Sequence, residues 1–236
     1  MDSRVKEILE QSRYAVFFGG AGMSTESGIP DFRSTDGLYH QKYDVPPEEI
    51  LSHTYFMRHT SEFYRFYRDK MNCLGAKPNP AHLALAEWEK RGILKAVITQ
   101  NIDGLHQAAG SQCVLELHGS VRRNFCFRCG KSHPAEEVFG AEDIPRCTCG
   151  GVIKPDVVLY EERLDDKTVD QAIRHMEAAD TLIVAGTSLT VYPAAGLVQY
   201  FRGDSLILIN RDPTPLDGEA TLCIHGSVGA VLGMEN

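Results

Sequence analysis

Four cysteines gathered in a short segment are the residues whose type and spacing point most directly to a chemical function. Cys126 and Cys129 form a Cys-x-x-Cys pair, and Cys147 and Cys149 follow after 17 intervening residues. Thiolates ~2.3 Å from a tetrahedral Zn²⁺ need two tight turns, and glycine follows each pair. The pattern predicts a zinc site of four cysteines, with His133 as the alternative fourth ligand and free thiols or a redox pair as the alternatives to a metal. Because a closed site leaves no open coordination position, its role would be structural.

A glycine-rich segment near the N-terminus could hold a phosphate-bearing ligand. The apolar run at 14–18 predicts a short buried strand, and the Gly-Ala-Gly sequence at 20–22 removes side chains where a backbone could approach a phosphate. Ser24 and Thr25 add hydroxyl groups and are predicted to cap the N-terminus of a helix. The alternative is a tight turn that binds nothing, because a short glycine motif alone is weak evidence.

Small or polar residues also follow three other predicted strands, at 100–103, at Thr187 and Ser188, and at Asn210. The carboxyl ends of parallel strands lie on one edge of a sheet, so these residues and the glycine turn together predict a crevice large enough for a dinucleotide. The second convincing strand begins only near Ile93. The compact βαβ unit of a typical dehydrogenase is therefore missing, and hydride transfer is not expected.

Alternating helices and strands account for most of the chain. Buried strands are expected at 14–18, 93–98, 114–117, 181–185 and 205–209, with an extended apolar run at 157–160. Helices are expected at 2–12, 62–71, 81–91, 168–179 and 193–201, and Pro46-Pro47 opens a further helix. This order predicts an α/β fold: a Rossmann-like parallel sheet with helices on both faces.

The overall composition limits the classes of protein to which the chain can belong. Its 236 residues are 43% hydrophobic and 24% charged, which is ordinary for a globular domain. The formal net charge of −8 argues against nucleic acid as the main partner. No apolar run approaches ~18 residues and the N-terminus has an amphipathic helical pattern, so neither a membrane span nor a signal peptide is expected. We expect a cytoplasmic monomer.

Together these motifs resemble the sirtuins, NAD-dependent protein lysine deacylases, over nearly the whole chain and in the family's order. The matching segments are 20–24, 28–33, 99–103, 118–119, the two cysteine pairs and 186–189. The chain looks like a compact bacterial-type member. The resemblance implies a Rossmann-like NAD-binding domain made of 1–33, 79–120 and 154–236. It also implies a small domain made of a helical module at 34–78 and a zinc ribbon at 121–153.

The resemblance further implies the reaction, in which acetyl-lysine and NAD give lysine, nicotinamide and 2′-O-acetyl-ADP-ribose. His118 matches the general base that draws a proton from a ribose hydroxyl, and Asn101 is the second residue assigned to catalysis. An imidazole with an ordinary pKa near ~6.5 can accept that proton at neutral pH. The residues expected to bind NAD are Ala21, Gly22, Thr25, Phe32, Arg33, Gln100, Ile102, Asp103, Thr187, Ser188, Asn210, Ser227 and Val228.

Individual roles are also implied by the resemblance. Asp103 would accept a hydrogen bond from the carboxamide of nicotinamide, and Phe32 would cover the ribose after nicotinamide leaves. An acetylated protein or peptide would pair as an extended strand with a segment that faces 189–193 and consists of Val157, Val158, Leu159 and Tyr160.

Three departures from the family pattern stand out. Gly19 replaces a common Thr, which should loosen the turn, and Glu161 replaces a common Gly at the end of the substrate strand. The sequence at 64–67 (Tyr-Arg-Phe-Tyr) lacks the Arg that would clamp a succinyl or malonyl group, so acetyl or longer apolar acyl groups are favoured. A protein mono-ADP-ribosyltransferase on the same scaffold and a non-catalytic zinc-ribbon binding module are the alternative functions.

Overall fold

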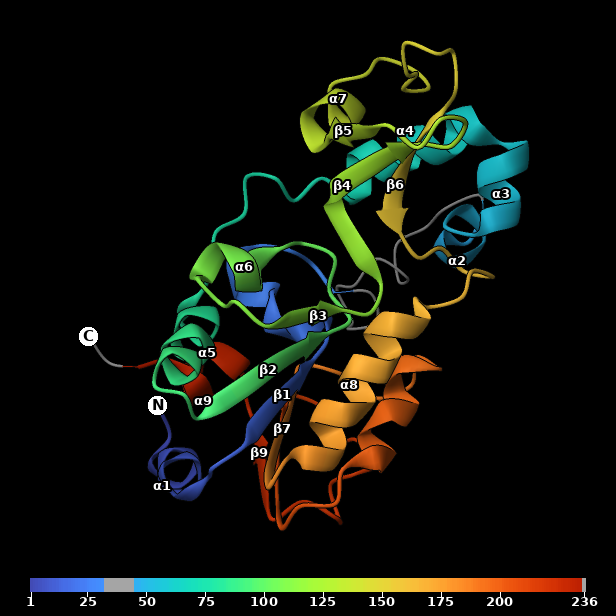
Figure 1. Ribbon diagram of the computed structural model, residues 1–236. Helices are drawn as coiled ribbons and strands as arrows, with labels where there is room; N and C mark the ends of the chain where they lie inside the picture. The colour runs from blue at the N-terminus through green and yellow to red at the C-terminus, as the bar shows by residue number, and fades with distance from the viewer. Residues whose placement is uncertain (32–44, 235–236) are drawn as a thin grey trace.

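A computed structural model describes residues 1–31 and 45–234 of the chain (Figure 1). Phe32 and Arg33, which are predicted to contact NAD, lie outside the described residues, as does the segment 34–44 of the predicted helical module. The described residues form a six-stranded sheet and a three-stranded sheet. None of their helices is long and apolar enough to cross a bilayer.

The large sheet has the strand order β3-β2-β1-β7-β8-β9, and all neighbouring strands are parallel. The chain places β2 and β3 on one side of β1 and then crosses to β7, β8 and β9 on the other side. A reversal of this kind leaves a crevice at the carboxyl ends of β1 and β7, where open α/β sheets bind ligands. The strands are β1 (Ala15–Gly19), β2 (Leu94–Thr99), β3 (Val114–Glu116), β7 (Thr181–Ala185), β8 (Ser205–Asn210) and β9 (Leu222–His225).

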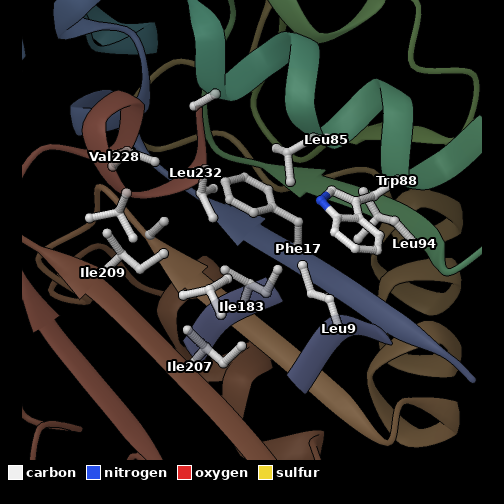
Figure 2. Packing of buried hydrophobic residues seen from close by; sticks show 14 of the residues in the cluster. Leu9, Phe17, Leu85, Trp88, Leu94, Ile183, Ile207, Ile209, Val228 and Leu232 are labelled. Carbon is white, nitrogen blue, oxygen red and sulfur yellow. The ribbon is translucent and has the colours of Figure 1, made fainter. Parts of the chain in front are cut away.

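Alternate side chains of the central strands enter two separate hydrophobic cores, as the period of two in a strand requires. On one face, Phe17 of β1 packs close to Leu85, with Trp88 and Leu232 in the same cluster (Figure 2). This core is covered by α1 (Ser3–Gln11), α5 (Pro80–Lys90) and α9 (Val228–Leu232). On the other face, Phe18 and Val184 pack under α8 (Asp166–Ala178) and the 3₁₀ helix η4 (Ala194–Tyr200).

The small sheet is antiparallel, with the strand order β5-β4-β6, and lies beside α4 (Figure 1). Its strands are β4 (Gly119–Cys126), β5 (Ser132–Pro134) and β6 (Ile153–Val157), and α7 (Ala135–Phe139) follows β5. A third core joins this sheet to α2 (Pro47–Ile50), α3 (His53–Arg58) and α4 (Thr60–Lys70). In that core Tyr67 of α4 stacks on Phe139 of α7, with ring centroids 5.4 Å apart. The helical segment and the cysteine segment, far apart in sequence, therefore fold around one core.

The five predicted strands of the large sheet are present with bounds shifted by one residue at most, because each is a short apolar run buried between two layers of helices. The predicted helix cap at Ser24 and Thr25 is wrong. Two 3₁₀ turns, η1 (Ala21–Met23) and η2 (Thr25–Ser27), occupy this region, and neither has a side-chain cap. The Ser24 hydroxyl is instead bonded to Asp103, so a tertiary contact replaces the local one.

The sequence also misjudged three elements near the C-terminus. The helix predicted at 193–201 is the 3₁₀ helix η4. The edge strand β9 and the helix α9 were not predicted, because β9 is only four residues long and mixes apolar and polar side chains.

Candidate active site

A cavity of about 830 Å³ opens at the carboxyl edge of the large sheet. Loops that follow β1, β2, β7 and β8 line it, together with residues of the helical segment and of β6. All predicted nucleotide and peptide residues within the described ranges lie in its wall: Ala21, Gly22, Thr25, Gln100, Asn101, Ile102, Asp103, His118, Val157, Val158, Leu159, Tyr160, Thr187, Ser188, Asn210, Ser227 and Val228. The size suits a cofactor or a drug-sized ligand.

The loops after β1 and β7 meet at two glycines. The backbone N–H of Gly22 donates to the carbonyl of Gly186 at 2.8 Å. A Cβ atom on Gly22 would lie 2.8 Å from the Cα of Gly186, which is too close for any side chain. Gly186 has a φ of +61°, in the region that favours glycine. Glycine is therefore required here by the contact between two loops, a reason that the sequence pattern did not reveal.

Polar side chains from the loops after β1 and β2 form a short chain of hydrogen bonds. Ser24 Oγ donates to Asp103 Oδ2 at 2.7 Å, and Asn101 Nδ2 donates to Ser24 Oγ at 3.0 Å. Asp103 Oδ1 accepts from the backbone N–H of Leu105 at 2.8 Å. The carboxyl group of Asp103 is buried, and this burial raises its pKa against the lowering effect of its two donors. A buried acceptor fixed on both oxygens is suited to recognise an amide N–H of a ligand.

His118 lies in the turn between β3 and β4 and is half-buried. Its Nδ1 is 2.9 Å from the carbonyl oxygen of Gln100. A carbonyl can only accept, so Nδ1 carries the proton and Nε2 of the neutral ring has a lone pair available. Burial lowers the pKa of His118, and the bond to Gln100 opposes this effect. The imidazole is thus poised as a neutral base.

Other residues expected to bind NAD lie in the loops after β2, β7 and β8 and at the start of α9. Gln100 Nε2 donates to Thr187 Oγ1 at 3.1 Å, which joins the loops after β2 and β7. Asn210 ends β8 and donates from Nδ2 to the carbonyl of Asp212 at 2.8 Å. Ser227 caps α9, its Oγ accepting from the N–H of Ala230 at 3.3 Å. Asn210 and Ser227 are therefore positioned by local bonds, and Gln100 and Thr187 by a bond between two loops.

The segment predicted to bind peptide is extended but belongs to the small sheet only as far as Val157, the last residue of β6. The N–H of Val158 donates to the carbonyl of His118 at 3.0 Å, so the backbone of the base holds this segment in place. Tyr160 forms a parallel bridge with Ser52, its N–H donating to Leu51 and its carbonyl accepting from His53. The backbone groups of Tyr160 are therefore already used within the chain.

A buried ion pair behind this segment was missed by the sequence reasoning. Lys154 Nζ donates to Glu162 Oε2 at 3.1 Å and to the carbonyl of Val157 at 3.0 Å. Glu162 Oε2 also accepts from the N–H of Leu159 at 2.9 Å. Lys154 is only 5% exposed, and a lysine this deeply buried must be paired. A lysine next to the apolar run at 157–160 was the only sequence signal, and it did not reveal the partner.

The helical side of the cavity ends against Tyr67, whose ring stacks between Phe63 and Phe139. Its hydroxyl is buried and has no hydrogen-bond partner among the described residues. Cys73 and Met71 line the same wall. Burial raises the pKa of the Cys73 thiol to about 11, so it is a neutral, weakly polar surface. Tyr67 stands at the position where the sequence predicted that a carboxylate-binding Arg would be missing, and Lys70 and Asn72 also line this side of the cavity.

Glu161 is one of two non-glycine residues with positive φ among those described, at +75°. Its carboxylate Oε2 accepts from the N–H of Thr54 at 2.9 Å, which ties the residue to the start of α3. Gly19 is the last residue of β1 and pairs with both neighbouring strands, and the loosening of the turn after it stays a prediction.

The four clustered cysteines do not line the cavity and lie at the end of β4 and in the segment between β4 and β6, with all Sγ atoms within 4.8 Å of one another. The Sγ atoms of Cys126 and Cys149 are 3.4 Å apart, and those of Cys129 and Cys147 are 3.8 Å apart. Tetrahedral Zn–S bonds of ~2.3 Å place sulfurs ~3.8 Å apart, so this donor set fits one structural Zn²⁺. His133 is outside the set and its Nδ1 pairs with Glu137 at 2.7 Å, which favours the four-cysteine site.

Comparison with known proteins gives a consistent result. The profile of the Sir2 family matches residues 20–193. An NAD-dependent protein deacetylase of Clostridium acetobutylicum is 57% identical over 98% of this chain and 96% of its own length. A solved structure of Sir2 with a p53 peptide and NAD+ superposes with a TM-score of 0.86 at 40% identity, covering 98% of this chain and 95% of the other. Another holds a deacetylated p53 peptide and 3′-O-acetyl ADP-ribose, with a TM-score of 0.88 at 40% identity, covering 97% and 94%.

Proposed function

The chain belongs to the Sir2 family and is an NAD-dependent protein deacetylase, and we propose that it deacetylates lysine with His118 as the general base. The observation that carries the assignment of residues is that one cavity gathers His118, the Ser24–Asp103 pair and the glycine loops at the carboxyl edge of a single sheet. Acetylated proteins or peptides are the proposed substrates, since the solved relatives hold a p53 peptide.

NAD supplies a nicotinamide leaving group and a ribose that takes up the acetyl group. The cavity fits this ligand in two respects. The glycine loops present backbone without side chains, and the Asp103 carboxyl is a fixed, buried acceptor for the carboxamide N–H. Ile102 lies beside Asp103 in the wall and would contact the nicotinamide ring.

His118 is proposed to take a proton from a ribose hydroxyl at Nε2, because Nδ1 is committed to the Gln100 carbonyl. The same carbonyl fixes the ring orientation. Asn101 is held through Nδ2 by Ser24, so we assign it to orienting the ribose. These bonds leave both side chains positioned before any ligand enters, which reduces the reorganisation needed during the reaction.

The peptide is proposed to pair with the edge at Val158 and Glu161. Among the described residues the carbonyl of Val158 accepts no backbone hydrogen bond and the N–H of Glu161 donates none, whereas both backbone groups of Tyr160 are bonded. The Lys154–Glu162 pair holds the carbonyl of Val157 and the N–H of Leu159, so it sets the direction in which the remaining groups point. Recognition through backbone groups implies that many sequences around the acetyl-lysine are accepted.

The decisive experiment incubates the protein with NAD and an acetyl-lysine peptide and identifies the products by mass spectrometry. Deacetylated peptide and O-acetyl-ADP-ribose in equal amounts are expected, and the formation of both should fall at least ~100-fold with His118→Ala. Transfer of ADP-ribose to protein without deacetylation would overturn the proposal in favour of the mono-ADP-ribosyltransferase. The same peptide carrying acetyl, butyryl and succinyl groups tests the acyl pocket, and succinyl is expected to be the poorest substrate because Tyr67 stands in place of the clamping Arg.

We further propose the domain division implied by the sequence, with 1–33, 79–120 and 154–236 binding NAD and with 34–78 and 121–153 forming the small domain. The shared core of α4 and the small sheet supports it. A cytoplasmic monomer remains our proposal for the working state.

A further inference from the structure

A cluster of three different ligand types lies at the free edge of the large sheet, at β9. Asp217, Cys223 and His225 each offer one atom, and these atoms lie within 4.8 Å of one another. His225 Nε2 is 3.3 Å from Asp217 Oδ2 and 3.8 Å from Cys223 Sγ. The four-cysteine site is on the small sheet, so the two clusters share no element (Figure 1).

The spacing of the residues explains why they meet. Cys223 and His225 are two positions apart on β9, so their side chains project from the same face of the strand. Asp217 comes from the preceding turn. Its Oδ1 accepts from the N–H and the Oγ1 of Thr214, at 2.9 and 2.8 Å, so Oδ2 is directed toward the histidine.

The distances match those of a bound metal ion. Zn–N and Zn–O bonds of ~2.0 Å and a Zn–S bond of ~2.3 Å in tetrahedral geometry give an N–O separation of ~3.3 Å and an N–S separation of ~3.6 Å. The observed values are 3.3 and 3.8 Å. One thiolate, one imidazole and one carboxylate form a donor set that suits Zn²⁺ better than Mg²⁺ or Ca²⁺, which prefer oxygen ligands.

The surroundings also resemble those of a metal site. Leu216, Ala220 and Cys223 pack at the margin of the hydrophobic core under α8, so the sulfur side of the cluster is apolar. The histidine side chain is 49% exposed and gives an ion access from solvent. Three protein ligands leave the fourth position for water.

We propose that Asp217, Cys223 and His225 form a second zinc site, with three protein ligands and one open position. Asp217 lies between β8 and β9, and Cys223 and His225 lie in β9. Gly226 and Ser227, which line the cavity, follow directly after His225. The site is independent of the proposed function, since its occupancy is measured by metal content alone.

The test dialyses the full chain against buffers of fixed free zinc concentration and measures bound zinc by atomic emission. The wild type is expected to bind about two equivalents, one of which is removed by a chelator too weak to empty the four-cysteine site. Asp217→Asn and His225→Ala should each bind about one equivalent. Both side chains are partly exposed, so these variants should fold, and thermal unfolding without added zinc verifies it.

The chain offers a matched control. Cys113 Sγ is also 3.8 Å from a histidine nitrogen, Nε2 of His175, but the second nitrogen of that ring contacts the hydroxyl of Tyr14 rather than a carboxylate. Cys113→Ser should therefore keep about two equivalents of zinc. The proposal is overturned if the wild type saturates at about one equivalent, or if Asp217→Asn and His225→Ala both retain the second.

Discussion

The hydroxyl of Ser24 donates a 2.7 Å hydrogen bond to the buried carboxyl of Asp103, and this bond joins the loops that follow β1 and β2. Those strands are neighbours in the parallel sheet, so the bond lies at the carboxyl edge where the cavity opens. It holds one oxygen of Asp103 while the N–H of Leu105 holds the other. The geometry thus prepares an acceptor that does not have to reorient when a ligand arrives.

Asp103→Asn should weaken nicotinamide recognition while leaving the fold intact, because the side chains have nearly the same shape. A hydrogen bond to a charged group contributes about 1.5–3 kcal/mol, so we expect the KM for NAD and the inhibition constant of nicotinamide to rise by roughly 10- to 100-fold. Ser24→Ala keeps the carboxylate and loses only its orientation, so its effect should be smaller. Steady-state kinetics with and without nicotinamide measure both, and unchanged inhibition in Asp103→Asn would contradict the assignment.

The pH dependence of kcat/KM should report the protonation of His118, the proposed general base. Burial lowers the pKa of His118, so the neutral form that can act as a base persists to lower pH than in a free imidazole, whose pKa is ~6.5. We expect kcat/KM to fall on the acid side with a midpoint below 6.5. His118→Ala should lose at least ~100-fold in turnover and keep NAD binding, measured by calorimetry. An acid limb that persists unchanged in the residual activity of the variant would assign the titration to another group.

The sequence predicted the residues at the carboxyl edge of the sheet better than the contacts that hold them in place. Apolar runs such as 181–185 predict buried strands, and the polar residues after them must share one edge of a parallel sheet, so Gln100 and Asn210 could be placed in one cavity. The Lys154–Glu162 pair could not be predicted, because the position of Glu162 relative to Lys154 depends on how the chain turns after β6. The contact of Gly22 with Gly186 joins loops far apart in sequence, and only the packing of β1 against β7 brings them together.

Glu161 provides a test of backbone strain beside the peptide site. With φ at +75°, an L-residue is disfavoured by roughly 1–2 kcal/mol, and glycine is not. Glu161→Gly and Glu161→Ala both lose the bond to Thr54, so their comparison isolates the strain. We expect the Gly variant to be more stable than the Ala variant by about 1 kcal/mol in urea unfolding, after allowance for the greater freedom of glycine in the unfolded chain. Equal stabilities would show that the positive φ costs nothing here.

Replacing one cysteine of the four-cysteine site should lower the zinc content and destabilise the core of the small sheet. Cys126 and Cys147 are buried in the core that also holds α4, so loss of the metal should loosen that core. Cys126→Ser is expected to bind about one zinc equivalent fewer than the wild type and to unfold at a lower temperature. Cys113→Ser, outside the site, is the control. Stable and active Cys126→Ser protein without this zinc would refute the structural role.

Two buried histidines should make the fold sensitive to acid. His82 and His106 are 0% and 1% exposed, with ring centroids 4.8 Å apart. Burial lowers the pKa of His82 to about 4 and also lowers the pKa of His106 well below its ordinary value. The unfolded chain takes up these protons below pH ~6.5 and the folded chain does not, so stability falls as the pH drops from ~6.5 toward 4. For His82 alone the loss approaches about 3 kcal/mol at pH 4.

His106→Leu separates this effect from general acid denaturation. Neither ring nitrogen of His106 has a hydrogen-bond partner among the described residues, so the change should cost little at pH 8 and should flatten the decline between pH 6.5 and 4.5. His82→Leu is the contrasting variant, because Nδ1 of His82 accepts from the N–H of Asn79 in a capping box and its loss should destabilise the fold at every pH. Urea unfolding across this range measures both. A decline in His106→Leu as steep as in the wild type would mean that the buried imidazole does not set the acid sensitivity.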